Sequence, residues 1–459
     1  MTSLFVEAAD ALELASPLRI SGRVGAVRGM TLTAPGVALP IGALVRVESG
    51  RAGGESVLGE VVGFDDGNAI VMLLGNADGL RAGARVESVR STPTVPVGDA
   101  LLGRCVDALG RPIDGRGPIR RATTRAIDAS PIGAMRRRPV DTTLHTGVRA
   151  IDLMATMGEG QRLGVFAGPG VGKSTLIGQI ARNGRAEVNV IALIGERGRE
   201  VREFIDHSLG PEGLERSVLV VSTSDESPVM RARAARAACT IAEEFRDRGK
   251  NVMLVMDSVT RFAHALRQIG LAVGEPPATK GYTPSVFAGL ASLLERAGGM
   301  LDSDRGAGGS ITGLYTVLVE GDDMTEPVAD AARGILDGHI ILSRALAQRG
   351  HFPAIDVLDS VSRAADQVSS PELIAARRRV RALLAAYAEI EELVQVGAYV
   401  PGGDPVADVA RQHRAEVLAI LQQGVSENEG PEEALARFIE LSDQTVRTET
   451  SLRSGEAGG

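Results

Sequence analysis

A glycine-rich loop with a lysine and two hydroxyl side chains lies between an apolar run and a helical pattern. The loop reads Gly168-Pro169-Gly170-Val171-Gly172-Lys173-Ser174-Thr175. Its glycines let backbone N–H groups turn inward around phosphate oxygens, Lys173 can reach the β- and γ-phosphates, and the Ser174 hydroxyl can ligate Mg²⁺. Ala167 stands where the usual pattern begins with glycine, but that position faces the preceding strand rather than the phosphate. The loop therefore predicts binding of a nucleoside triphosphate with Mg²⁺.

A second candidate for this chemistry is Asp257, which ends the apolar run of residues 251–257 about 80 residues after the loop. In P-loop enzymes, a carboxylate at the end of such a strand holds the shell of Mg²⁺. Apolar strands that end in aspartate are common, so the assignment of Asp257 depends on its combination with the loop.

Two further clusters leave alternatives open when only their residue types are considered. Glu196 follows the apolar run 188–195, and it could polarise an attacking water or belong to a solvated charged turn. Within residues 349–363, Phe352 could stack on a base and Arg363 could act as an arginine finger. The same two side chains could equally be a core aromatic and a surface arginine.

The composition limits the class of protein. A chain of 459 residues with 44% hydrophobic and 24% charged residues should form two or three globular domains. Its net charge of −8 argues against a protein that wraps nucleic acid. Cys105 and Cys239 stand in apolar contexts, which suggests reduced thiols and a cytosolic setting. No apolar run approaches the 18 or so residues of a membrane span.

The hydrophobic pattern divides the chain into four predicted domains. Residues 1–17 carry an apolar helical stripe that could dock on a partner or cap the fold. Residues 18–92 alternate short apolar segments with glycines, which predicts a small β-barrel followed by a linker at 92–96. Residues 93–370 alternate strands and helices, which predicts a parallel α/β domain with ligands at the carboxyl ends of its strands. Residues 371–459 predict a helical domain with a break at 400–405 and a frayed tail from Thr445.

Three motifs in this order make the chain resemble the α/β-subunit superfamily of rotary ATP synthases. Within it, the chain is similar to the homohexameric ATPases of flagellar and type III protein export. Residues 353–356 with 360–362 resemble the superfamily signature, and the motifs similar to the export branch are 195–204, 274–282 and 335–340. The acidic lever motif of ATP synthase β subunits is missing. The resemblance implies an α/β RecA-like P-loop ATPase core with an N-terminal small β-barrel and a C-terminal helical domain.

The resemblance also implies roles for single residues in binding and hydrolysing ATP. Glu196 would orient the attacking water, and Arg197 would help to hold that glutamate and the γ-phosphate. Arg261 would contact the γ-phosphate, and Phe352 would stack on adenine. Arg363 would be the finger supplied to the neighbouring subunit's site. Lys173 joins the catalytic residues, and the implied metal ligands are Ser174 and Asp257.

We therefore expect an ATP hydrolase that forms a homohexameric ring and energises the unfolding and export of protein substrates. The expected partners are further copies of the chain, stator or regulator proteins, central-stalk export proteins, a membrane export gate and chaperone–substrate complexes, without nucleic acid. The expected location is the cytoplasm, peripherally at the inner-membrane export apparatus.

Other functions share the same ATPase core. A catalytic subunit of an ion-translocating ATP synthase would need a second, related chain alternating in the ring. A Rho-like RNA helicase would carry stacking aromatics and basic side chains on its barrel, whereas residues 18–89 hold one aromatic, Phe64, and no lysine. A binding module without catalysis is disfavoured because the loop lysine, both carboxylates and the finger arginine are all present.

Overall fold

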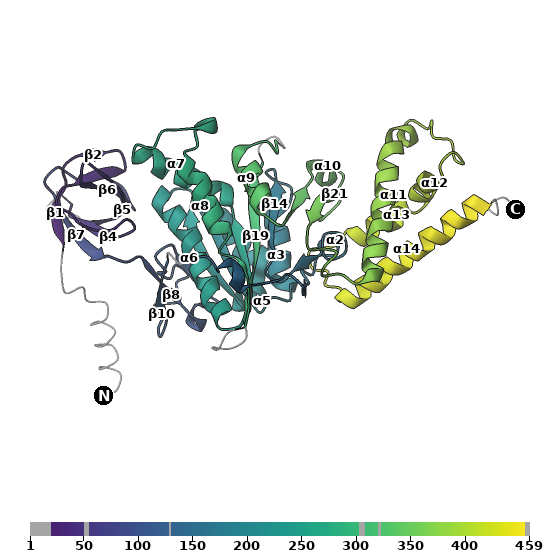
Figure 1. Cartoon of the computed structure of the whole chain (residues 1–459), viewed down its shortest axis with the longest axis horizontal. Helices are drawn as coiled ribbons and strands as arrows, with labels where there is room; N and C mark the ends of the chain where they lie inside the picture. The colour runs from purple at the N-terminus through teal and green to yellow at the C-terminus, as the bar shows by residue number, and fades with distance from the viewer. Residues whose placement is uncertain (1–19, 50–54, 128–129, 303–307, 320–322, 455–459) are drawn as a thin grey trace.

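The computed structural model describes residues 20–49, 55–127, 130–302, 308–319 and 323–454, arranged in three parts along one long axis (Figure 1). A small β-barrel lies at one end, a sheet flanked by helices lies in the middle, and a group of helices lies at the other end. This arrangement confirms the predicted fold class. The predicted domain boundaries stay predictions, and the expected helix at residues 1–17 lies outside the described residues.

The barrel is a seven-stranded antiparallel sheet in the order β1-β7-β4-β5-β6-β3-β2. Alternation along the strands directs Val45, Val61, Val71 and Val86 into its core, where all four are fully buried. The pattern does not predict the hairpin of β2 and β3, because these strands have only two and four residues. The strands are β1 (Ser21–Arg23), β2 (Val27–Arg28), β3 (Thr31–Ala34), β4 (Leu44–Val47), β5 (Val57–Asp65), β6 (Asn68–Leu73) and β7 (Arg85–Arg90).

The prediction of a linker at residues 92–96 was wrong, because part of this segment is a strand. Thr94–Val97 forms β8, which pairs antiparallel with β10 (Thr123–Ala126). Val95 and Val97 are buried. Among the described strands, β8 pairs only with β10, so Pro96 is tolerated because the missing N–H of proline faces an unpaired edge.

The middle part is built on a ten-stranded sheet whose main path runs β21-β20-β14-β19-β17-β15-β16-β9. All neighbours along this path are parallel except β20 and β21, which are antiparallel. The strands are β9 (Cys105–Asp107), β14 (Arg162–Ala167), β15 (Val188–Glu196), β16 (Ser217–Thr223), β17 (Asn251–Asp257), β19 (Ser310–Leu318), β20 (Gly338–Leu342) and β21 (Ile355–Ser362), with β11 (Arg137–Arg138) and β18 (Gly298–Met300) attached beside β19.

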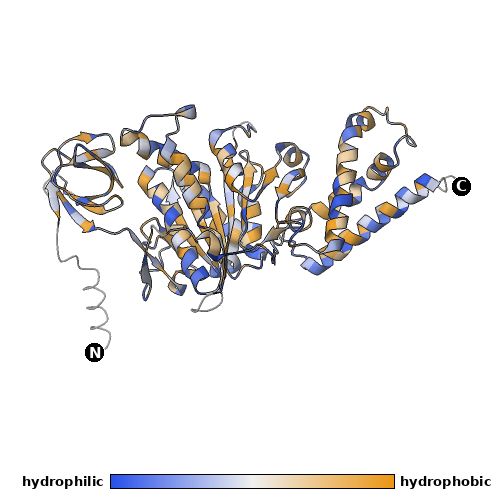
Figure 2. Ribbon diagram, viewed as in Figure 1, coloured by the Kyte–Doolittle hydropathy of each residue, from blue (hydrophilic) through white to orange (hydrophobic). Residues whose placement is uncertain are grey.

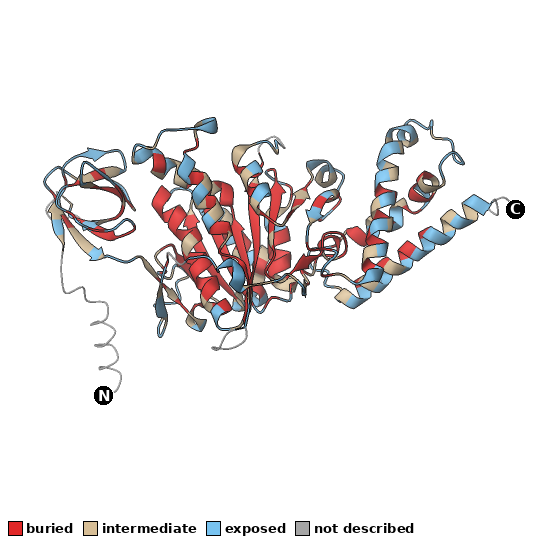
Figure 3. Ribbon diagram, in the orientation of Figure 1, coloured by how far each residue is buried: buried red, intermediate tan, exposed pale blue. Residues whose placement is uncertain are grey.

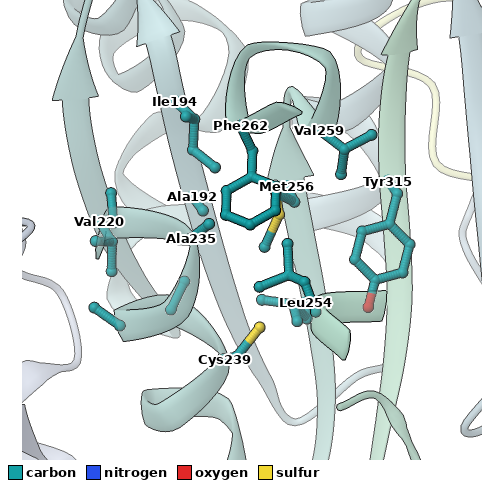
Figure 4. Packing of buried hydrophobic residues seen from close by; sticks show 14 of the residues in the cluster. Ala192, Ile194, Val220, Ala235, Cys239, Leu254, Met256, Val259, Phe262 and Tyr315 are labelled. Carbon is teal, nitrogen blue, oxygen red and sulfur yellow. The ribbon is translucent and has the colours of Figure 1, made fainter. Parts of the chain in front are cut away.

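Helices cover both faces of this sheet, so its strands are apolar on both sides (Figure 2). In β15, Ala192 and Ile194 join the core beneath α6, α7 and α8, part of which is drawn in Figure 4. Ile191 and Leu193 join a second core beneath α3. The buried residues fill the middle of the molecule (Figure 3). The helices around the sheet are α2 (Arg149–Met154), α3 (Lys173–Asn183), α4 (Gly198–Glu203), η3 (Phe204–Leu209), α5 (Gly210–Glu215), α6 (Pro228–Asp247), α7 (Val259–Ala272), α8 (Pro284–Leu294), α9 (Pro327–Ile335) and α10 (Arg344–Gln348).

The C-terminal part is helical, and the predicted break at 400–405 separates α11 from α12. The prediction of a frayed tail from Thr445 was wrong, because α14 continues to Ser454 and Thr445 is fully buried. Arg379 of α11 donates from its Nε to Thr445 Oγ1 at 3.0 Å, which ties the tail to the domain. Among the described helices, none is both long and apolar enough to cross a membrane. The helices are α11 (Pro371–Gln395), α12 (Pro405–Gln412), α13 (Arg414–Leu421) and α14 (Pro431–Ser454).

Candidate active site

The glycine-rich loop joins the carboxyl end of β14 to the first turn of α3. Gly170 and Gly172 have φ angles of 77° and 94°, which residues with a side chain rarely adopt. Ala167 is buried in β14, so the departure from glycine at this position leaves the loop unchanged. Ser174 is exposed in the first turn of α3, where backbone N–H groups attract anions.

Three charged side chains meet beside this loop. The Lys173 ammonium donates to Asp257 Oδ1 and lies 3.5 Å from Glu196 Oε1. The two carboxylates are neighbours because β15 and β17 pair in parallel, with Leu193 opposite Asp257. The site therefore concentrates one cation and two carboxylates at the carboxyl edge of the sheet, where the sequence predicts them.

A threonine that the sequence reasoning missed holds one of these carboxylates. Thr316 of β19 is fully buried, and its hydroxyl donates to Asp257 Oδ1 at 2.7 Å. The signal available in the sequence was weak, since a threonine in an apolar strand is ordinary β-sheet composition.

Burial and the nearby charge of Asp257 raise the pKa of Glu196 to about 7, although Lys173 opposes the shift. Burial lowers the pKa of Lys173, but the two carboxylates outweigh burial and leave that pKa raised. A glutamate that titrates near neutral pH can accept a proton from water in a way that an ordinary surface glutamate cannot.

Two arginines next to Glu196 have different environments. The Arg261 guanidinium donates to the carbonyl oxygen of Gly195 at 2.8 Å, so it is held directly behind the glutamate. Gly195 has a φ of 70°, which residues with a side chain rarely adopt, and a Cβ there would lie 3.2 Å from the Arg261 side chain, so this strand end favours glycine. The side chain of Arg197 is 78% exposed and lies 3.4 Å from Glu200. Arg197 is therefore at the surface of the chain, whereas Arg261 is part of the cluster.

Phe352 and Arg363 lie at opposite edges of the sheet, although only ten residues separate them. Phe352 is half-exposed, and its ring would lie 3.9 Å from a Cβ at Gly172 of the loop. Antiparallel β21 then starts beside the carboxyl end of β20, with Ile355 opposite Leu342, and ends with Ser362 opposite Gly338. Arg363 follows at the amino edge. The structure thus gathers Phe352 and the charged cluster at the loop and leaves Arg363 apart from them.

The oxygen donors near the loop fit Mg²⁺. Ser174 offers a hydroxyl and Asp257 offers a carboxylate, both hard ligands of the kind that Mg²⁺ prefers. In the described part of the chain, no three His, Cys, Asp or Glu residues come together as a metal cluster. Mg²⁺ in nucleotide sites takes only one or two protein ligands beside phosphates and water, so a two-residue donor set suits it.

A parallel sheet with a P-loop at its carboxyl edge and two carboxylates around the loop lysine defines a P-loop ATPase. Three family models cover most of the chain. The nucleotide-binding domain of the ATP synthase alpha/beta family matches residues 147–362, the beta-barrel domain of that family matches 19–90, and the T3SS EscN ATPase C-terminal domain matches 369–440. The chain belongs to the ATP synthase alpha/beta family, in the branch of the flagellar and type III secretion ATPases, and it is an ATP-hydrolysing enzyme.

Relatives with curated names agree over nearly the full length. The chain is 51% identical to the "Flagellum-specific ATP synthase" of Treponema pallidum over 91% of this chain and 92% of the relative. It is 48% identical to the "Type 3 secretion system ATPase" of Xanthomonas euvesicatoria over 92% and 94%. Among solved structures, the assembled ATPase EscN of the enteropathogenic E. coli type III secretion system superposes with a TM-score of 0.84. It is 41% identical and covers 92% of this chain and 100% of EscN.

Proposed function

We propose that this chain hydrolyses ATP in a ring of identical subunits and thereby energises the unfolding and export of proteins through a flagellar or type III apparatus. The observation that carries the proposal is the separation of Arg363 from its own loop. From Arg162 to Ala167, β14 spans roughly 15–20 Å, which is more than an arginine side chain can cross. Arg363 therefore cannot reach its own loop, which supports a role at the nucleotide site of a neighbouring copy.

The mechanism that these residues support begins at Glu196. Its carboxylate orients water for in-line attack on the γ-phosphate and accepts the proton. Lys173 and Arg261, with Arg363 of the neighbouring copy, neutralise the charge that develops on the transferring phosphoryl group. Phe352 binds adenine by stacking. Ser174 and Asp257 would hold Mg²⁺, which would supply further positive charge to the phosphate oxygens.

The relatives support assembly with copies of the chain and binding of a central-stalk protein. EscN has been solved in an assembled form and in complex with its central stalk EscO. We infer that this chain likewise assembles with copies of itself and binds a central-stalk protein. A stator, an export gate and chaperone–substrate complexes complete the expected set of partners, which would place the ring in the cytoplasm at the inner membrane.

The alternative of a rotary ATP synthase subunit is less well supported. The C-terminal domain matches the model of type III secretion ATPases. An ATP synthase subunit would also require a second, related chain for activity, whereas the proposed ring needs only this chain.

The test of the proposed chemistry is Glu196→Gln. The amide keeps the shape of the side chain but cannot accept the proton, so turnover should fall by several powers of ten while ATP binding stays largely intact. Glu203→Gln is the matched control and should retain full activity, because Glu203 is a half-exposed glutamate at the end of α4, seven residues beyond Glu196. Steady-state hydrolysis and ATP affinity are measured on the same preparations. Hydrolysis by Glu196→Gln within a few-fold of the parent would remove Glu196 from the mechanism.

A further inference from the structure

A fully buried amide, Gln161, connects to the residue that precedes Arg363. Its Nε2 donates to Ser362 Oγ at 2.9 Å, and its Oε1 accepts from the Gly158 N–H at 2.9 Å. The Ser362 hydroxyl in turn donates to the carbonyl oxygen of Thr156 at 2.8 Å. Each polar group in this chain of contacts therefore has a partner, which fixes the end of β21 firmly.

The backbone of Arg363 is held from a second side. Its N–H donates to the carbonyl oxygen of Asp337 at 2.9 Å. The Asp337 carboxylate forms an ion pair with Arg162, whose guanidinium donates to both carboxylate oxygens at 3.1 Å. Gln161 and Arg162 are adjacent at the start of β14. This one strand end therefore holds both Ser362, which precedes Arg363, and Asp337, which accepts from the Arg363 N–H.

The guanidinium of Arg363, in contrast, is left available. Its side chain is exposed and borders a cavity of about 400 Å³ that also touches Gln161 and Arg162. Among the described residues, no hydrogen bond or ion pair occupies the Arg363 guanidinium. The main chain is therefore fixed while the charged group remains free to reach outward from the subunit.

We propose that Gln161 is a positioning residue that sets where Arg363 enters the neighbouring copy's nucleotide site. The inference rests on the proposed function, because it takes Arg363 to act between copies. A guanidinium stabilises developing charge only within a narrow range of positions, and a displacement of about 1 Å can cost roughly 100-fold in rate. A loosened β21 end would move the base of the Arg363 side chain by such amounts without touching any nucleotide.

The test is Gln161→Leu, which keeps the bulk but removes all three side-chain hydrogen bonds, including a longer one of 3.4 Å from Nε2 to the Asp337 carbonyl oxygen. We expect rings to form and ATP affinity to stay within about twofold, while kcat falls roughly 10- to 100-fold. Asn189→Leu is the matched control: Asn189 is also a buried amide at the start of a strand, but its side chain bonds to Ala181 and Ser217, away from Arg363. If Gln161→Leu does not fold, Ser362→Ala breaks the same contact from the other side.

Mixed rings separate positioning from a general loss of structure. Gln161→Leu chains have an intact loop and a misplaced finger, so they should regain activity when mixed with inactive Lys173→Ala chains, whose fingers are intact. They should not regain it with Arg363→Ala chains. The proposal is overturned if kcat of Gln161→Leu is unchanged, or if Lys173→Ala chains do not restore its lost activity. It is also overturned if Asn189→Leu loses as much activity and Lys173→Ala chains restore that activity too. If mixing Arg363→Ala and Lys173→Ala chains restores no hydrolysis, Arg363 does not act between copies. That result overturns the proposed function itself, and the proposed role of Gln161 is then overturned as well.

Discussion

Three influences act on the carboxyl group of Glu196. It is partly buried, it faces the carboxylate of Asp257, and it lies 3.5 Å from the Lys173 ammonium. Burial and Asp257 outweigh the lysine, so the pKa of Glu196 rises to about 7. A carboxyl group with a raised pKa keeps its proton to higher pH, and only its ionised form can accept a proton from water.

The pH dependence of hydrolysis follows from the upward shift in the pKa of Glu196. We expect kcat/KM for ATP to rise with pH up to about 7 and to level off above it, because kcat/KM reports the ionisation of the free enzyme. The profile is measured with enough magnesium to keep ATP in one metal-bound form. His264→Gln is the control. Burial lowers the pKa of His264, so replacing this histidine should leave the rise of kcat/KM at the same pH. A rise of kcat/KM centred near pH 4 to 5, the ordinary range for a carboxyl group, would contradict the assignment.

Phe352 offers a second prediction at the scale of single side chains. If its ring stacks on adenine, Phe352→Ala should weaken ATP binding by roughly 1–3 kcal/mol, whereas Phe352→Tyr should be nearly neutral. Phe64 is the matched control, because it is 50% exposed against 47% for Phe352 but lies in the barrel. Equilibrium binding of ATP measures the effect. Unchanged affinity in Phe352→Ala would make this ring a packing residue only.

At the scale of elements, the central strands were the most predictable. Residues 188–195 and 251–257 are continuous apolar runs because both faces of the sheet are covered, and they form β15 and β17. The roles of Gln161 and Thr316 were not predictable, because each depends on hydrogen bonds between segments more than 50 residues apart. The tail was mispredicted because its polar composition conceals one buried position, Thr445, that only the fold reveals.

The docking of the last helix is testable through Arg379. The side chain of Arg379 is 15% exposed and pairs with Glu449 of α14, while its neighbour Arg378 is 75% exposed. Arg379→Ala should destabilise the docked helix by about 1–3 kcal/mol and speed hydrogen exchange of α14 amides by about 5- to 150-fold. Arg378→Ala should change exchange little, because exposed ion pairs contribute little. Equal protection in both variants would show that the contacts of Arg379 do not hold α14 in place.

At the scale of the whole molecule, the sheet holds the proposed catalytic residues and the proposed finger at opposite edges. Its carboxyl edge holds the loop, Glu196 and Phe352, while its amino edge presents Arg363. Under the proposed function, such a molecule needs a neighbouring copy to complete its site. In a closed ring, where each interface joins unlike surfaces, every copy would receive the finger of one neighbour and supply its own to the other.

The most direct measurement of that claim is the activity of mixed rings. Lys173→Ala chains lack the phosphate-binding lysine and Arg363→Ala chains lack the finger, so each alone should be nearly inactive, since a finger contributes about 10³–10⁵ in rate. In randomly mixed rings, about a quarter of the interfaces join an intact Lys173 loop to an intact Arg363, and activity should return in that proportion. If mixing the two inactive chains restores no hydrolysis while mixed rings do form, Arg363 does not act between copies, and the account is contradicted.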